Sequence, residues 1–540
     1  MVAPQRRGGP CYLAGVSRPP LRTVADLLAA LPEALHPEAL DVALDAPIGT
    51  PTDDSRAVEP GACFLAAPGL TVDGHRFVGK ALAAGASLIV AQRDRAADLP
   101  ELAGTPRVLV DDSRAALPLL AAGWYGWPGE RLALAGVTGT NGKTTAAHLV
   151  GAVLRHAGRP HLRLGTTGNW VVDHETSAAF TTPFPLELQA LLADGLARGA
   201  THGVMEVSSH ALEQGRAAPL RFAAVGLTSF SQDHLDFHPT MAEYLAAKCL
   251  LARHHCDPAG VAVAPREQGE AAAAFLAAAG EGGVARCWRT SRSPVDEREA
   301  EIAVVERDRT RAGLRACIRT PAGELELRSP MVGEFNLDNL LVTVGLCLGL
   351  GLSLAEIAAA LASARGAPGR LEPVVLPDHP EQAGPRVYVD YAHTPDAVER
   401  ALEALRPSVP AGAKLIVLLG CGGDRDPHKR PLMGGVASRG AERFYATSDN
   451  PRTEDPEAIV DQMIAGVAAN TAELIREVDR ATAIARAVAE AEPSDLVLIA
   501  GKGHEDYQIL GTTKIHFDDR EHAAAALEAR LSAPAKPDRG

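Results

Sequence analysis

The segment that decides the fold is rich in glycine and threonine and runs Gly136-Val137-Thr138-Gly139-Thr140-Asn141-Gly142-Lys143-Thr144-Thr145. It follows a short apolar run, residues 132–137, and precedes an Ala/Leu/Val-rich stretch with helical spacing, residues 145–156. Glycines let a backbone fold around phosphate oxygens, and the first turn of a helix offers unpaired N–H groups. The order strand, loop and helix therefore predicts a phosphate-binding loop.

Two side chains of this loop suit phosphate chemistry. Lys143 supplies positive charge, and the hydroxyl of Thr144 can bind the magnesium ion that bridges nucleotide phosphates. The spacing departs from the usual motif, because the first glycine is expected at Val137 and stands at Gly136. A Gly/Thr-rich turn without phosphate chemistry is the alternative, and the order of the flanking elements argues against it.

Composition sets the outer limits. A chain of 540 residues is expected to form two to four domains. The formal net charge of -14 counts against a nucleic-acid-binding surface. The eight cysteines are scattered without a C-x-x-C pair, which is typical of reduced thiols. The sequence shows no convincing signal peptide and no apolar run of about 18 residues, so a cytoplasmic protein that does not enter membranes is expected.

The chain divides into three blocks, which we expect to be domains: residues 1–128 with an extension of about 20 residues, 129–367 and 368–540. Strand and helix patterns alternate in each, which predicts an α/β fold with parallel sheets covered by helices. A polar segment with alternating apolar residues, 300–328, predicts a hairpin. Other expected strands span residues 88–91, 203–207, 223–228, 260–264, 387–391, 414–419, 443–447 and 496–500, and expected helices span 241–252, 336–348 and 354–364.

Polar residues gather where expected strands end, and there the chemistry of open α/β sheets is usually found. Glu206 lies in the apolar run Met205-Glu206-Val207, where a carboxylate needs a partner, and magnesium would be one. After the next strand, Asp233-His234-Leu235-Asp236 is dense in potential ligands. Zinc is the alternative there, but the absence of a nearby cysteine and the presence of a nucleotide loop favour magnesium and phosphate.

Seven motifs occur in the order found in the Mur ligase family, and the resemblance covers roughly residues 21–530. The motifs are residues 136–145, 205–210 (Met-Glu-Val-Ser-Ser-His), 233–236, 333–339 (Gly-Glu-Phe-Asn-Leu-Asp-Asn), 369–372 (Gly-Arg-Leu-Glu), 390–395 (Asp-Tyr-Ala-His-Thr-Pro) and 422–425 (Gly-Gly-Asp-Arg). The resemblance implies an N-terminal UDP-substrate domain, a central P-loop ATPase-like domain with a parallel sheet, and a C-terminal Rossmann-like domain that binds the amino acid.

The resemblance also implies a reaction. ATP phosphorylates a carboxylate, and an amine then attacks the acyl phosphate to leave an amide, ADP and phosphate. By the same resemblance the catalytic residues are Lys143, Glu206, His234 and Lys248, with Lys248 carbamylated to support a second Mg²⁺. The implied metal contacts are Thr144, Glu206, His234 and carbamylated Lys248. The implied ATP contacts are Gly139, Thr140, Asn141, Gly142, Lys143, Thr144, Thr145, Asn336, Arg370, Asp390 and His393.

The resemblance assigns a UDP-sugar peptide to the first block and the central block. Its implied contacts are Ser55, Leu70, Thr71, Val72, Thr181, Thr182, Ser208, Gln214 and Arg216. Arg216 has the clearest physical reason, because an anionic ligand favours a fixed guanidinium. Two positions depart from the family pattern: Phe180 and Ser229 each stand where asparagine is common. We expect altered ligand contacts there without loss of activity.

The incoming amino acid is implied by the third block. Asp449-Asn450-Pro451-Arg452 resembles the signature of ligases that add meso-2,6-diaminopimelate, in which the arginine binds the distal carboxylate that lysine lacks. Arg425, Gly501 and Glu505 complete the implied pocket. The expected activity is therefore ATP-dependent addition of meso-diaminopimelate to UDP-N-acetylmuramoyl-L-alanyl-D-glutamate, in the cytoplasmic synthesis of peptidoglycan precursors, by a monomer.

Two alternatives remain at this level. One is a related ligase for another substrate, such as a lysine-adding muramyl ligase or a folylpolyglutamate synthase; the signature at residues 449–452 and the type of first block count against both. The other is a non-catalytic nucleotide-binding regulator. The presence of Lys143, Glu206 and Lys248 together counts against it, because a degenerate copy does not need all three.

Overall fold

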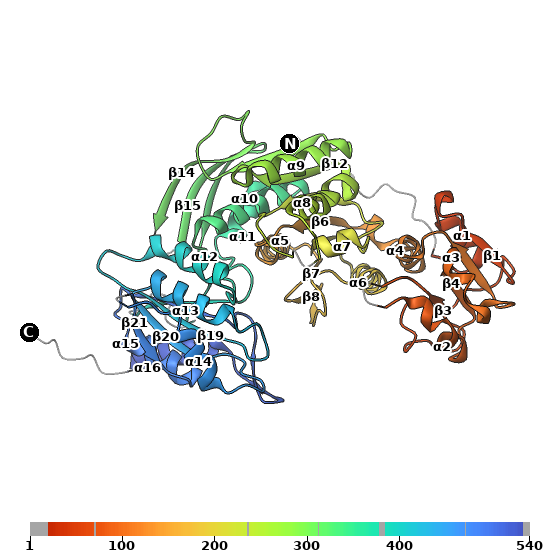
Figure 1. The fold of residues 1–540 in the computed structure, drawn as a ribbon. Helices are drawn as coiled ribbons and strands as arrows, with labels where there is room; N and C mark the ends of the chain where they lie inside the picture. The colour runs from red at the N-terminus through yellow and green to blue at the C-terminus, as the bar shows by residue number, and fades with distance from the viewer. Residues whose placement is uncertain are drawn as a thin grey trace, which may run out of the picture. The chain divides into compact units, whose positions relative to one another are not determined.

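The computed structural model describes residues 20–69, 72–234, 237–310, 313–376, 384–469 and 471–532. They form two compact units (Figure 1). The first unit takes most of the chain before Val305 with Cys317–Leu325 and Asp338–Leu361, and the second takes Glu306–Ala316, Glu326–Leu337 and the chain from Ala362 onward. Among the described residues, no helix combines the length and apolar character needed to cross a membrane.

The N-terminal part of the first unit is a five-stranded sheet in the order β1-β5-β4-β3-β2. Only the β1–β5 pair is antiparallel. One face packs under α1 and α4, and the other packs against α2. The strands are β1 (Glu38–Leu40), β2 (Pro51–Thr52), β3 (Cys63–Leu65), β4 (Leu88–Gln92) and β5 (Arg107–Val110), and the helices are α1 (Val24–Ala30), α2 (Val78–Ala83), α3 (Arg93–Ala96) and α4 (Ser113–Trp124).

The central sheet has eleven strands in the order β16-β15-β14-β13-β12-β11-β6-β10-β7-β8-β9. Its strands are β6 (Ala133–Thr138), β7 (His161–Gly165), β8 (Gly168–Val171), β9 (His174–Thr176), β10 (His202–Glu206), β11 (Phe222–Leu227), β12 (Cys256–Pro265), β13 (Arg286–Ser291), β14 (Ile302–Thr310), β15 (Gly313–Thr320) and β16 (Gly323–Ser329). β6 pairs in parallel with β10 and β11, and Val137 is opposite Glu206 while Thr138 is opposite Leu227. The carboxyl ends of these three strands therefore meet at one edge.

Alternation along β11 shows how helices cover both faces of this sheet. Val225 and Leu227 belong to a core with Phe275 of α9. Gly226 faces the opposite way, where an added Cβ would lie 2.9 Å from Val342 Cγ1 of α10. α5 (Lys143–His156), α10 (Glu334–Gly349) and α11 (Leu354–Leu361) cover that second face, and α6 (Pro185–Ala197), α7 (Ser209–Glu213), α8 (Met241–Leu250) and α9 (Gly269–Glu281) cover the first.

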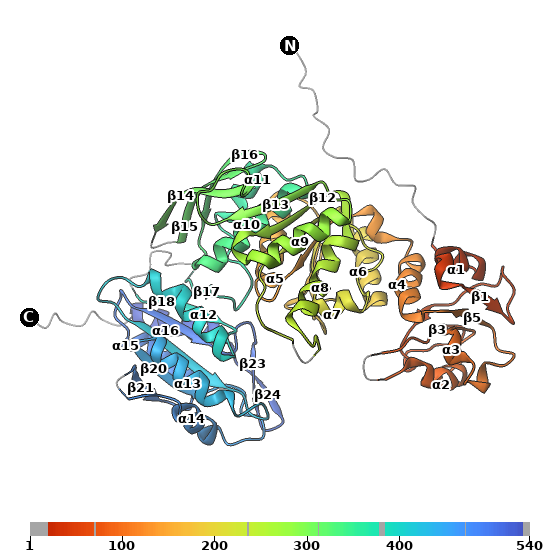
Figure 2. The same ribbon diagram turned by 45° about the horizontal axis from the view of Figure 1, so that its top comes forward.

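The second unit contains a six-stranded sheet in the order β17-β18-β22-β19-β20-β21, parallel except for β17. Its strands are β17 (Glu372–Pro373), β18 (Arg386–Asp390), β19 (Leu415–Cys421), β20 (Arg443–Ser448), β21 (Glu473–Arg476) and β22 (Leu496–Ala500), with a separate hairpin of β23 (Tyr507–Leu510) and β24 (Thr513–His516). Figure 2 shows the helices around this sheet: α12 (Pro395–Leu405), α13 (Lys429–Gly440) and α14 (Pro456–Ile464) on one face, α15 (Arg480–Glu490) and α16 (Asp519–Ser532) on the other.

The structure contains every strand and helix expected from the sequence, although several ends are shifted. One expectation is wrong: the segment 300–328 is not a hairpin but holds three strands, β14, β15 and β16. In β16, apolar Leu325 and Leu327 are buried while Glu324, Glu326 and Arg328 are exposed. The same alternation thus continues through a third strand. Alternation of apolar and polar residues does not show where one strand ends and the next begins, so it did not predict the number of strands. The helix expected to Ala252 ends at Leu250 and continues as one π-helical turn, Leu251–His255.

Candidate active site

The phosphate-loop segment connects β6 to α5, as its sequence predicts. Gly139 and Gly142 have φ angles of 150° and 87°, which favour glycine. Space also requires glycine, since a Cβ on Gly139 would lie 2.1 Å from Thr228 Oγ1 and one on Gly142 would lie 2.3 Å from Asn339 Oδ1. Lys143 Nζ donates to the carbonyl oxygens of Gly139 and Thr140, each at 2.9 Å. The loop is therefore tightly folded, with its cation held against its own backbone.

Glu206, at the end of β10, is buried beside the loop and is 1% exposed. Its Oε2 accepts from Thr144 Oγ1 at 2.9 Å and from Thr166 Oγ1 at 3.2 Å. Its Oε1 accepts from the Thr166 backbone N–H at 2.8 Å. Gly165 leaves the space, because a Cβ there would lie 2.1 Å from Glu206 Oε1. The structure thus brings together two of the predicted metal contacts, Thr144 and Glu206.

Lys248, on α8, is 1% exposed and also reaches the loop. Its Nζ donates to the Gly139 carbonyl oxygen at 2.9 Å and lies 4.2 Å from the centre of the Tyr244 ring. The Tyr244 hydroxyl is 3.2 Å from Thr140 Oγ1, so the same aromatic side chain supports both loop and lysine. Burial, with repulsion from Lys143, holds the pKa of Lys248 well below its usual value. A lysine of this kind has a larger neutral, nucleophilic fraction.

His234 lies in the neighbouring loop with a half-exposed side chain and a φ of 52°. Its ring packs edge-on against His210 at 4.8 Å and lies 6.0 Å from Tyr244, and its Nε2 is 3.4 Å from Asp233 Oδ2. In the described part of the chain, no group of three or more His, Cys, Asp and Glu residues could hold a metal ion. This donor set does not fit a closed zinc site. One carboxylate and one hydroxyl beside a phosphate loop fit magnesium, which takes its remaining ligands from phosphate and water.

Predicted substrate contacts line the region next to Glu206. Thr182 Oγ1 donates to the Glu206 carbonyl oxygen at 2.9 Å and accepts from the Ser208 N–H at 3.1 Å. Thr181 Oγ1 is 3.1 Å from Thr166 Oγ1. Arg216 is 7% exposed, and its guanidinium donates to Gln214 Oε1 at 2.8 Å and to the Thr182 carbonyl oxygen at 3.2 Å. Four of the predicted residues, Thr182, Ser208, Gln214 and Arg216, thus form one hydrogen-bonded group, and Thr181 is linked to it through Thr166 and Glu206.

The two positions that depart from the family pattern have defined contacts. Phe180 packs edge-on against Phe184 at 5.0 Å, and the Arg216 guanidinium lies 3.8 Å from the Phe184 ring and 5.4 Å from the Phe180 ring. The Ser229 hydroxyl donates to the Asn141 carbonyl oxygen at 3.0 Å and accepts from the Asn141 N–H at 2.9 Å. Phe180 therefore packs beside the Arg216 guanidinium, and Ser229 holds the backbone of the phosphate loop at Asn141.

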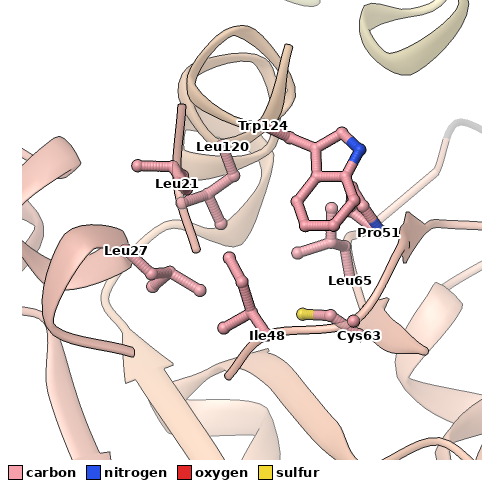
Figure 3. A pocket seen from close by; sticks show the side chains of 9 residues that line it. Leu21, Leu27, Ile48, Pro51, Cys63, Leu65, Leu120 and Trp124 are labelled. Atoms are coloured by element: carbon pink, nitrogen blue, oxygen red, sulfur yellow. The ribbon is translucent and has the colours of Figure 1, made fainter. Parts of the chain in front are cut away.

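Two of the other predicted UDP-substrate contacts, Ser55 and Val72, lie in described loops near the N-terminal sheet. Ser55 is buried and Val72 is exposed, while Leu70 and Thr71 lie outside the described residues. A small pocket beside α4 does not suit an anionic ligand, because no charged side chain lines it (Figure 3). It is lined by Leu21, Leu27, Ile48, Gly49, Pro51, Cys63, Leu65, Leu120 and Trp124.

In the second unit, buried Asp449, Asn450 and Lys502 form a polar cluster with half-buried Glu505. Lys502 Nζ lies 3.1 Å from Asp449 Oδ1 and donates to Asn450 Oδ1 at 2.9 Å. Asn450 Nδ2 donates to Glu505 Oε2 at 3.0 Å. Gly501, with φ of 120°, allows the close approach, since a Cβ there would lie 2.8 Å from Asp449 Oδ2. Burial and the nearby Asp449 raise the pKa of Glu505.

Arg452 and Arg425 both lie next to Gly422, where an added Cβ would be 3.1 Å from Arg452 Nη1 and 3.7 Å from Arg425 Cγ. Arg452 Nη1 donates to the Gly423 carbonyl oxygen at 2.7 Å. Its backbone, which follows Pro451, has φ of 52° and donates to the Ile509 carbonyl oxygen at 3.1 Å. The structure thus places the Arg452 guanidinium and the Arg425 side chain together beside Gly422.

The remaining predicted nucleotide contacts in the second unit are Asn336, Arg370, Asp390 and His393. Asp390 accepts from the N–H groups of Leu371 and Ala392 at 2.7 and 2.8 Å, and burial raises the pKa of Asp390. Arg370 lies over the Tyr391 ring at 5.1 Å, and His393 is 4.6 Å from the same ring. Asn336 is buried and donates to the Val332 carbonyl oxygen at 2.8 Å.

Several residues in these groups were not predicted from the sequence, among them Thr166, Tyr244 and Lys502. Thr166 carries no signal, since a threonine in a turn is ordinary. Tyr244 lies four residues before Lys248 on α8, which is the spacing of neighbours on one helix face. Lys502 comes two residues after the buried strand β22 and stands between two glycines. A charged residue at the carboxyl end of a buried strand could have indicated a site residue from the sequence.

Comparison with known proteins gives three matches along the chain. Residues 52–125 match the description "Mur ligase family, catalytic domain", residues 137–347 match "Mur ligase middle domain", and residues 369–503 match "Mur ligase, glutamate ligase domain". Together they cover most of the chain.

Similar proteins agree with these matches. The UDP-N-acetylmuramoyl-L-alanyl-D-glutamate--2,6-diaminopimelate ligase of Parasynechococcus marenigrum (strain WH8102) is 45% identical over 510 residues, which cover 92% of this chain and 99% of that protein. The protein of the same name from Gloeobacter violaceus is 46% identical over 481 residues, covering 89% and 94%. A solved structure with that name has a TM-score of 0.70 at 30% identity, covering 92% of this chain and 98% of its own. The chain therefore belongs to the Mur ligase family.

Proposed function

We propose that this chain is an ATP-dependent ligase that joins meso-2,6-diaminopimelate to UDP-N-acetylmuramoyl-L-alanyl-D-glutamate. Relatives of that name are 45–46% identical over about nine-tenths of the chain. One observation carries the proposal. Lys143, Thr144, Glu206 and Lys248, from three different elements, meet at the Gly139–Gly142 loop.

The reaction has two steps. A carboxylate oxygen of the substrate attacks the γ-phosphorus of ATP, the bond to ADP breaks, and an acyl phosphate forms. The amine of the amino acid then attacks the acyl carbon, loses a proton, and phosphate leaves. Lys143 places a cation beside the phosphates, and the loop N–H groups bind their oxygens. Magnesium, held by Thr144 and Glu206, would supply further positive charge to offset repulsion between the anionic reactants.

Lys248 is proposed to be carbamylated. The neutral amine attacks CO₂ and loses a proton, which yields an N-carboxylate. The lowered pKa of Lys248 favours this step, because only the unprotonated amine is a nucleophile. The product would offer oxygen ligands for a second magnesium, with His234 as a further partner. In the second unit, Asn336, Arg370, Asp390 and His393 are proposed as ATP contacts.

The UDP-sugar peptide is proposed to bind the hydrogen-bonded group around Arg216. A buried guanidinium, stacked on Phe184 and joined to Thr182, is pre-oriented for an anionic group of the ligand. The proposed contacts are Ser55, Leu70, Thr71, Val72, Thr181, Thr182, Ser208, Gln214 and Arg216.

The amino-acid pocket is proposed to lie in the second unit. Arg452 is suited to the distal carboxylate of diaminopimelate, and Glu505 to an ammonium group. Lysine would leave the guanidinium without an anionic partner, which favours diaminopimelate. The proposed contacts are Arg425, Asp449, Asn450, Pro451, Arg452, Gly501 and Glu505.

The broader expectations also belong to this proposal. The chain is proposed to act in the cytoplasm as a monomer, on small molecules and without a nucleic-acid partner. Its domains are proposed to be residues 1–128, 129–367 and 368–540, which the three family matches support.

Trapping of the acyl phosphate tests the chemistry. With the UDP-substrate, ATP, magnesium and hydroxylamine but no amino acid, the chain should release ADP and form the hydroxamate of the substrate. Glu206→Gln should abolish both signals. Glu213→Gln is the matched control, because Glu213 is the last residue of α7 and is not a proposed metal contact; both signals should be unchanged in this variant. Absence of ADP release with every substrate combination would favour the non-catalytic alternative.

A further inference from the structure

The buried lysine Lys502 has no assigned part in the reaction. It is 0% exposed, and its Nζ has three oxygen neighbours: Asp449 Oδ1 at 3.1 Å, Asn450 Oδ1 at 2.9 Å and the Tyr507 carbonyl oxygen at 2.8 Å. Two of these contacts are hydrogen bonds, to Asn450 and to the Tyr507 carbonyl, and the third is an ion pair with Asp449. Lys502 is therefore fixed and does not reach out to a ligand.

This arrangement settles the orientation of the Asn450 amide. Its Oδ1 is met by two groups that can only donate, Lys502 Nζ and the Ile509 N–H, at 2.9 and 3.0 Å. A flipped amide would place its own N–H₂ against both donors. Nδ2 must therefore point the other way, where it donates to Glu505 Oε2 at 3.0 Å.

The orientation of Glu505 follows from that of Asn450. One carboxylate oxygen, Oε2, is engaged by Asn450. Burial and repulsion from Asp449 raise the pKa of Glu505, whereas the nearby charge of Lys502 lowers it. Lys502 also forms an ion pair with Asp449. Without the ammonium, the repulsion between these two carboxyl groups would lose its nearest compensating charge.

The same lysine joins the Asp449–Arg452 segment to β23. It bridges Asn450 to the Tyr507 carbonyl, while Gln508 Nε2 donates to the Asp449 carbonyl oxygen at 2.6 Å and Arg452 N–H donates to Ile509. The segment that carries Arg452 thus depends on this strand, and the ammonium group of Lys502 is part of the bridge.

We propose that Lys502 is a positioning residue for the incoming amino acid: it fixes the Asn450 amide and, through it, the Glu505 carboxyl group that receives the ammonium group of the substrate. This inference rests on the proposed ligase function, and it extends it to a residue that does not touch the substrate.

Steady-state kinetics of Lys502→Met test the inference, with Lys514→Met as the matched control. Lys514 is exposed on the same hairpin and lies 3.7 Å from the Tyr507 ring, but it has no contact with Asn450. Lys502→Met should raise KM for diaminopimelate by about tenfold or more and leave KM for ATP and for the UDP-substrate within about twofold. Lys514→Met should change none of the three. Equal KM values for diaminopimelate in wild type and Lys502→Met would overturn the inference.

A double-mutant cycle separates positioning from a general structural role. If Lys502 acts through Asn450, the KM effects of Lys502→Met and Asn450→Ala will not add, whereas additive effects contradict the inference. If Lys502→Met does not fold by circular dichroism, Asn450→Asp replaces it; this variant keeps Lys502 but removes the amide donor to Glu505, and the same selective rise in KM is expected. A wild-type chain that makes no product would overturn the proposed function itself, and this inference with it.

Discussion

Lys143 and Lys248 place their ammonium nitrogens on the same oxygen atom, the carbonyl of Gly139, each at 2.9 Å. One lysine comes from the first turn of α5 and the other from α8, 105 positions later in the chain. Two cations on one carbonyl repel each other, and this repulsion adds to burial in lowering the pKa of Lys248. Lys143 thus provides positive charge where the proposed phosphates bind, and its repulsion favours the neutral amine of Lys248 that carbamylation requires.

Carbamylation of Lys248 should make activity depend on CO₂. In CO₂-depleted buffer the ligase activity should fall, and bicarbonate should restore it, because the carbamate forms reversibly. Lys248→Arg should be inactive with or without bicarbonate, since a guanidinium does not form the carbamate. Activity of the wild type that ignores CO₂ across pH 7–9 would contradict the modification.

Lys248 should also reduce the stability of the free protein. Its pKa is lower in the folded than in the unfolded chain, so the unfolded state binds the extra proton and folding is penalised. This loss of stability is largest at pH values below the pKa of Lys248 in the folded chain. It disappears as the pH rises through the pKa of lysine in the unfolded chain, which is about 10. In CO₂-free buffer Lys248→Met should therefore have the higher Tm at neutral pH, with a gain that shrinks toward pH 10. A gain that grew with pH would contradict the sign.

Arg216 should control affinity for the UDP-substrate. Removing a charge-assisted hydrogen bond costs about 1.5–3 kcal/mol, so Arg216→Met should raise KM for that substrate by about 10- to 100-fold. KM for diaminopimelate should stay within about twofold. Arg221→Met, an exposed arginine five positions later, is the matched control and should have wild-type kinetics. Equal effects on both substrates would show general damage instead of a binding role.

The ion pair between Arg480 and Asp519 should be important for the stability of the second unit. Both side chains are 0% exposed, Arg480 Nη2 is 2.6 Å from Asp519 Oδ2, and the same guanidinium donates to the carbonyl oxygens of Ser448 and Ala500. Arg480→Ala leaves a buried carboxylate alone and should lower the free energy of unfolding by about 3–5 kcal/mol. Urea unfolding followed by circular dichroism measures this. Removal of an exposed pair, as in Arg400→Ala beside Asp396, should cost less than about 1 kcal/mol.

The sequence predicted the order of strands and helices well, because the spacing of apolar residues along the chain reflects both the type of element and the face that is buried. Residues 496–500 were expected as a strand and form β22 with the same bounds. The count of strands in 300–328 was wrong, since one alternating pattern continues through three strands. The phosphate loop and Glu206 could be found because glycine spacing and a carboxylate in an apolar strand are unusual.

Contacts between distant segments could not be predicted in this way. Ser229 was recognised as a departure, but its exchange of hydrogen bonds with Asn141 requires the pairing of β11 with β6. Lys502 contacts Asn450, 52 positions away, only because parallel strands bring their carboxyl ends together. Resemblance to a family places residues at a site, whereas the structure shows which atoms support one another.

Product analysis by mass spectrometry tests the central claim most directly. The purified chain would be incubated with UDP-N-acetylmuramoyl-L-alanyl-D-glutamate, ATP and magnesium, with meso-diaminopimelate or L-lysine in separate reactions, and the same would be done with Arg452→Ala. We predict tripeptide product with diaminopimelate alone, and a loss of this preference in Arg452→Ala. Product with lysine alone would contradict the assigned role of Arg452, and no product with either amino acid would contradict the ligase function.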